Sequence, residues 1–259
     1  MLLSSKMSLE IFYPLPVLPF LLLHNILSAT PHALAKPVLP LNEQTYSSQS
    51  IALNNNLELS QQMSYQEWIK ILRREAEVAS LKKPEHLTVL AGDSLTQWFP
   101  RDLFPKSKAW LNQGISGETS TGLLKRLQLL DSTEPETFFI MIGINDLLQG
   151  VTDEVLLANQ QQIIDNLRRI HPQSKIVVQS ILPHSRQSLT DKIPNSRIRK
   201  INERLKAIAT QKGALYLDLH PLFTDSQGNL RTELGTDGLH LSRQGYQVWF
   251  SAINLWINE

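Results

Sequence analysis

Apolar and polar positions form blocks of two lengths along the last two thirds of the chain. Short apolar runs of strand length lie at 87–91, 109–112, 138–142, 175–182 and 214–217. Longer segments repeat apolar residues at helical spacing and lie at 64–81, 119–130, 153–170, 195–212 and 242–257. Alternating strands and helices indicate a parallel sheet with helices on both faces. We therefore predict an α/β fold, a doubly wound three-layer α/β/α sandwich with about five strands.

The N-terminal segment has a different pattern. An apolar run over 11–27 follows a single lysine, and an A-x-A pattern closes the segment at 33–35. This pattern predicts a secretory signal peptide over 1–35, cut after Ala35, and export to the periplasm or the medium. Left uncleaved, the segment would anchor the chain to a membrane. A stable transmembrane helix is not expected, because the run is short and contains prolines.

A polar stretch follows the predicted cut. Residues 36–63 are rich in Asn, Gln and Ser, which predicts a linker. Ser64 and Glu67 then have the spacing of a capping box, which marks the start of a helix. We predict one domain over 64–259, with its motif-bearing core at 87–259.

Composition narrows the function classes. The 259 residues suffice for one full core, and the net charge of +1 comes without long basic or acidic runs. Nucleic-acid partners are therefore not expected. The chain has no cysteine, which excludes disulfides, thiolate catalysis and Cys-ligated zinc. We expect no metal and no cofactor, and the sequence leaves the oligomeric state open.

Polar residues follow the first three predicted strands. Ser94 comes after the first, Asn112 to Gly114 after the second, and Asn145 after the third. Ligands of doubly wound sheets bind beyond the carboxyl ends of the strands. We therefore expect these three clusters to converge on one site.

Ester chemistry would suit such a site. A serine hydroxyl needs a base, and Asp237 and His240 are spaced so that the carboxylate can orient the imidazole against Ser94. Negative charge that develops on the substrate needs hydrogen-bond donors. The backbone amides of Ser94 and Gly114 and the side-chain amide of Asn145 are the candidate donors.

The same residues carry a resemblance to a known family. The Gly-Asp-Ser-Leu run at 92–95, the segment 112–117, Gly-Ile-Asn-Asp at 143–146 and Asp-Gly-Leu-His at 237–240 resemble, in order and spacing, the four blocks of the GDSL-type lipase/acylhydrolase family, also called SGNH hydrolases. The resemblance runs from residue 87 to the end.

This resemblance implies roles for individual residues. It implies Ser94 as nucleophile, His240 as base and Asp237 as the group that orients the base. Gly114 and Asn145 are implied as oxyanion donors together with the Ser94 amide. A flavodoxin-like sandwich without a metal is implied as well.

The expected activity is that of a serine ester hydrolase acting on small-molecule acyl esters, either short to medium in chain length or lysophospholipid-like. Two alternatives stay open: a carbohydrate O-acetylesterase, and a non-catalytic glycan-binding module of the same fold. Ile115, Ile144 and Leu147 are candidate contacts for an acyl chain, although they also suit the core.

Two further features lie near these motifs. Trp98 and Phe99, just after the nucleophile, are expected in the core. The polar loop at 183–194 either borders the cleft or is an ordinary connection.

Overall fold

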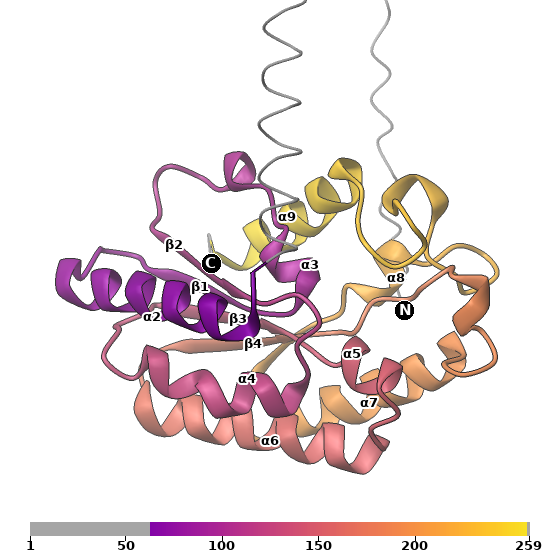
Figure 1. Cartoon of the computed structure of the whole chain (residues 1–259), viewed down its shortest axis with the longest axis horizontal. Coiled ribbons are helices and arrows are strands. Elements are labelled where there is room, and N and C mark those ends of the chain that lie inside the picture. The colour runs from indigo at the N-terminus through magenta and orange to yellow at the C-terminus, as the bar shows by residue number, and fades with distance from the viewer. Residues whose placement is uncertain (1–62, 258–259) are drawn as a thin grey trace, which may run out of the picture. The chain divides into compact units, whose positions relative to one another are not determined.

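One parallel sheet organises the part of the chain that the computed structural model describes, residues 63–257 (Figure 1). Its strands run in the order β2-β1-β3-β4-β5, so the first strand lies next to both the second and the third. The strands are β1 (Thr88–Gly92), β2 (Trp110–Gly114), β3 (Thr137–Met141), β4 (Lys175–Gln179) and β5 (Leu215–Leu217). The predicted five-stranded doubly wound sheet is confirmed.

Helices cover both faces of this sheet (Figure 1). One face packs against α2 (Tyr65–Lys82), α4 (Ser120–Arg126), α6 (Asp153–Ile170) and α7 (Asn195–Gln211). The other packs against α3 (Ser94–Gln97), α8 (His220–Phe223) and α9 (Arg243–Ile257). The remaining helical segments are α5 (Ile144–Leu148), η1 (Arg101–Leu103), η2 (Leu127–Leu130), η3 (Gln187–Leu189) and η4 (Thr232–Leu234).

The strand side chains alternate between the two layers. Val89 and Ala91 face the core under α2, α4, α6 and α7, whereas Leu90 faces the core under α9. In the second core Trp249 is fully buried, and its indole N–H donates to Gln179 Oε1 at 2.6 Å. Burial on both faces explains why the strands read as continuous apolar runs.

Several element boundaries differ from the predictions, and three of the differences are larger than one residue. The second strand continues to Gly114 rather than ending at 112, because Gly114 pairs with Gly92 of β1, so residues 112–114 lie in the strand and not after it. The fourth strand ends at Gln179 rather than at 182, because the amide of Ile181 donates to Asn202 Oδ1 at 2.8 Å and not to a strand. The helix expected over 119–130 divides into α4 and the 3₁₀ turn η2.

The structure bears on only one of the N-terminal predictions, the capping box. The capping box at the start of α2 is present, with the Ser64 amide donating to Glu67 Oε2 at 2.7 Å. The predicted signal peptide and nearly all of the linker lie outside the described residues and stay predictions. Within 63–257, no helix is both long and apolar enough to cross a membrane.

Candidate active site

Ser94 is the first residue of α3, directly beyond the end of β1. Asp93 caps this helix by accepting the Leu95 amide at 3.0 Å. Gly92 allows the turn, because a Cβ there would lie 2.2 Å from the Met141 carbonyl oxygen on β3. The close approach of β1 to β3 therefore requires glycine just before the candidate nucleophile.

A line of hydrogen bonds joins Ser94 to the C-terminal motif. Ser94 Oγ lies 3.1 Å from His240 Nε2, and His240 Nδ1 lies 3.0 Å from Asp237 Oδ2. The other carboxylate oxygen accepts the amides of Leu239 at 3.0 Å and His240 at 2.8 Å. With the Nδ1–H tautomer, Nε2 can accept the serine proton, and Asp237 holds the ring in that orientation.

Asp237 also stays ionised in this setting. Partial burial opposes its ionisation, but the hydrogen bonds from the amides and ring of the turn outweigh it and hold the pKa of Asp237 at about 2. Arg186, from the loop at 183–194, forms an ion pair with the same oxygen that His240 contacts. The Ser185 amide donates to Gly238 O at 2.8 Å, so this loop borders the site.

Trp98 contacts His240, the candidate base, and the sequence analysis did not predict this contact. Its ring centroid lies 4.3 Å from that of His240, and the residue is only half-buried. Phe99 lies in the core as expected. Strand and helix spacing carry no signal for the Trp98 contact, because it joins segments more than a hundred residues apart.

Asn145 projects from α5, beyond β3. One of its side-chain N–H groups donates to the Glu118 carbonyl oxygen at 3.0 Å, which leaves the second for a ligand. The neighbouring Asp146 is fully buried and accepts the Ser120 amide at 2.8 Å and its hydroxyl at 2.5 Å. These contacts hold α5 against the loop that follows β2.

The structure speaks against Gly114 as a free oxyanion donor. Its amide donates to Asn112 Oδ1 at 3.0 Å, and a Cβ at this position would lie 2.2 Å from the Gln97 nitrogen. The absence of a side chain at Gly114 therefore allows β2 to pack closely against α3. Gly117, in the loop that follows, is exposed with φ +76°. No hydrogen bond to another described residue occupies its amide.

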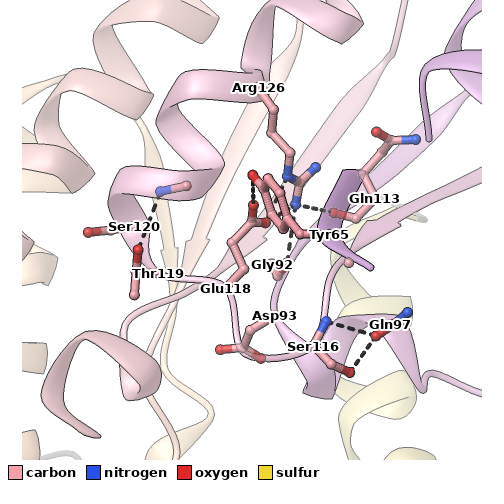
Figure 2. Close-up of polar contacts among 12 residues, drawn as sticks. Tyr65, Gly92, Asp93, Gln97, Gln113, Ser116, Glu118, Thr119, Ser120 and Arg126 are labelled. Atoms are coloured by element: carbon pink, nitrogen blue, oxygen red, sulfur yellow. Dashed lines mark hydrogen bonds and ion pairs between the residues drawn. The ribbon is translucent and has the colours of Figure 1, made fainter. Parts of the chain in front are cut away.

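The loop that carries Gly117 is held from several sides (Figure 2). Gln97 Oε1 accepts the Ser116 amide at 2.8 Å and the Ser116 hydroxyl, so α3 fixes the start of the loop. The side chain of Glu118 points to Arg126 and Tyr65.

The three apolar candidate contacts are buried. Ile115, Ile144 and Leu147 are 2%, 5% and 3% exposed, which favours a core role over contact with an acyl chain. A cavity that Ile144 lines beside Asp93 measures only about 10 Å³. Among the described residues, no group of three or more His, Cys, Asp or Glu side chains could hold a metal ion.

Comparison with known proteins gives consistent matches. The sequence model of the GDSL-like Lipase/Acylhydrolase family matches residues 85–248. Platelet-activating factor acetylhydrolase IB subunit alpha1 of Bos taurus is 31% identical over 192 residues, which cover 69% of this chain and 77% of the bovine one.

Solved structures share the fold. One from Streptococcus pneumonia, named for platelet activating factor, has a TM-score of 0.67 and 26% identity and covers 81% of this chain and 99% of its own. A GDSL-like lipase from Bacteroides thetaiotaomicron has a TM-score of 0.61 and 21% identity and covers 72% and 97%. The chain is thus an ester hydrolase that belongs to the GDSL-like lipase/acylhydrolase family.

Proposed function

We propose that the chain hydrolyses short-chain acyl esters through Ser94, His240 and Asp237. His240 takes the hydroxyl proton as Ser94 Oγ attacks the ester carbonyl, and then gives that proton to the leaving alcohol. Water, activated by the same imidazole, attacks the acyl-serine and releases the carboxylic acid. This proposal rests on two contacts in series: Ser94 Oγ lies 3.1 Å from His240 Nε2, and His240 Nδ1 lies 3.0 Å from Asp237 Oδ2.

For the tetrahedral intermediate, we infer an oxyanion hole that differs from the one expected from sequence. Its donors are the Ser94 amide, the free side-chain N–H of Asn145 and the Gly117 amide, which replaces that of Gly114. The engaged amide of Gly114 and the unoccupied, exposed Gly117 support this assignment. Preorganised donors of this kind stabilise the charge that develops in the transition state.

A short acyl group is favoured by the packing around Ser94. The apolar side chains that could have lined an acyl channel, Ile115, Ile144 and Leu147, pack into the protein instead. The relative with 31% identity is an acetylhydrolase by name, which agrees with a small acyl group.

The test is hydrolysis of p-nitrophenyl acetate, butyrate, octanoate and palmitate. We expect the highest kcat/KM for acetate or butyrate. Ser94→Ala should lower kcat at least about a thousandfold. Ser251→Ala, which removes an exposed hydroxyl on α9, should leave it unchanged.

Other outcomes would point elsewhere. Turnover that survives in Ser94→Ala would exclude Ser94 as the nucleophile. An optimum at palmitate would contradict the short-chain proposal. Activity on acetylated xylan but on none of the nitrophenyl esters would identify a carbohydrate O-acetylesterase.

A further inference from the structure

A buried ion pair lies beneath the loop after β2. Arg126 of α4 donates through Nε and Nη2 to Glu118 Oε2, with the Nε contact at 2.7 Å, and the two side chains are 4% and 1% exposed. A buried pair of this kind is stable only when further hydrogen bonds satisfy both partners. Here those further bonds go to the segments that carry the candidate catalytic groups.

Arg126 joins the ends of two strands. Its Nη2 donates to Gln113 O at 2.7 Å and to Gly92 O at 3.3 Å (Figure 2). Gly92 lies two residues before Ser94, and Gln113 leads into the loop with Gly117. The guanidinium therefore connects the nucleophile turn with this loop, in addition to the backbone pairing of β1 with β2.

Glu118 connects the third segment. Its backbone carbonyl accepts from Asn145 Nδ2 at 3.0 Å, and it directly follows Gly117. Each of the three groups that we assign to the oxyanion hole is thus connected to Glu118 or Arg126 by a hydrogen bond, by adjacency in the chain, or by both.

The remaining carboxylate oxygen is satisfied from outside the family-matched region, which begins at residue 85. The Tyr65 hydroxyl, in the first turn of α2, donates to Glu118 Oε1 at 2.9 Å (Figure 2). Burial and the charge of Glu118 raise the pKa of Tyr65 to about 12, so the hydroxyl keeps its proton near neutral pH. A second contact, from Gln113 Nε2 to Leu72 O at 3.3 Å, also joins α2 to the end of β2.

We propose that Tyr65 is a positioning residue, through which helix α2 holds the loop at 115–119, with its Gly117 amide, in catalytic geometry by way of Glu118 and Arg126. This inference rests on the proposed hydrolysis by Ser94. Helix α2 then helps to set the geometry of the active site, in addition to covering one face of the sheet.

Tyr65→Phe tests the proposal, because it removes one hydroxyl from a residue that is 43% exposed and leaves no internal cavity. We expect kcat for p-nitrophenyl acetate to fall about three- to thirtyfold, less than the loss of an entire oxyanion donor. KM should stay within about twofold, since the lost interaction acts on the transition state. Amide hydrogen exchange over 115–118 should become faster.

Two further variants separate positioning from general stability. Tyr216→Phe removes the hydroxyl of a half-buried tyrosine on β5 and should change neither kcat nor exchange over 115–118. Ser64→Ala keeps the phenol but removes the cap of α2, so it should give a smaller loss of kcat in the same direction.

The outcomes are distinct. An unchanged kcat together with unchanged exchange over 115–118 in Tyr65→Phe would overturn the positioning role, as would an equal loss of kcat in Tyr216→Phe. If the unmodified protein shows no Ser94-dependent turnover, the proposed function fails. Hydrogen exchange then still decides whether Tyr65 holds the loop.

Discussion

Asp93 lies next to the candidate nucleophile and is only 1% exposed. Burial raises the pKa of its carboxyl to about 7, although the Leu95 amide partly offsets this effect. The Asp93 side chain can therefore cap α3, but burial disfavours its charged form. Its neighbour Ser94 depends on the same turn, so the protonation of Asp93 bears on the stability of the site.

Asp93→Asn should flatten the pH dependence of stability. The folded pKa of Asp93 is about 7 and its ordinary value is 3.8, so the folded state binds the proton more tightly. The free energy of unfolding that depends on Asp93 therefore falls as the pH rises from about 4 to about 7, and it is level above that. Asparagine cannot ionise, so the variant should gain stability relative to the parent as the pH rises through this window.

Urea unfolding at pH 5 and pH 8 measures the effect. Asp191→Asn, an exposed substitution, is the control and should follow the parent at both values. The prediction is contradicted if Asp93→Asn loses as much stability between the two pH values as the parent does.

Arg186→Gln should lower activity with little effect on stability. The guanidinium holds the Asp237 oxygen that also orients His240, but the pair is partly exposed and contributes at most about 1 kcal/mol. We expect kcat/KM to fall about two- to tenfold at low salt, and added salt should narrow the difference. Steady-state kinetics at two ionic strengths check this.

The matched control is Arg231→Gln. It breaks an ion pair with Glu233 of similar exposure outside the Asp237–His240 turn. Equal losses in the two variants would show that the contact of Arg186 with Asp237 has no specific role.

At the scale of elements, β2 packs closely against α3 at Gly114. A Cβ there would lie 2.2 Å from the Gln97 nitrogen and 2.8 Å from the Asp93 carbonyl oxygen. Both atoms are backbone and cannot move aside without shifting α3. The packing of one strand against one short helix thus sets the place of Ser94.

Gly114→Ala should destabilise the protein by about 1–3 kcal/mol and lower activity together with it. Gly150→Ala is the comparison, because its φ of +76° is strained for alanine but nothing lies within 4 Å of a new Cβ. We expect that variant to lose about 1 kcal/mol and keep its activity. Thermal unfolding and p-nitrophenyl acetate turnover measure both, and a fully active, stable Gly114→Ala protein would refute the close-packing role.

For the chain as a whole, the N-terminal pattern leads to a proposal about export. We propose that residues 1–35 direct secretion and are cut after Ala35, so that exported material begins at Lys36. Mass spectrometry of the mature protein from the periplasm or medium tests this. Recovery of the intact chain only from the cytoplasm would rule the proposal out.

The sequence alone determined the fold class and the approximate position of each strand, because period and run length are local properties that burial imposes on each element. It also predicted that Ser94 and Asn145 lie at one edge, since parallel strands present their carboxyl ends there. That Asp237 and His240 meet Ser94 was expected from the chemistry of a serine nucleophile and from the family resemblance. The distances from Ser94 to His240 and from His240 to Asp237 agree with the second expectation, and the chemical roles of all these residues stay predictions.

Only the tertiary structure decided which groups near the site are free and which are engaged. It showed that Asn112 occupies the Gly114 amide, that Trp98 contacts His240, and that Arg186 shares the Asp237 carboxylate. The support of Glu118 by Tyr65 spans 53 residues. Contacts between distant segments depend on how the layers pack and on which rotamers fit, and no local pattern of apolar and polar residues encodes them.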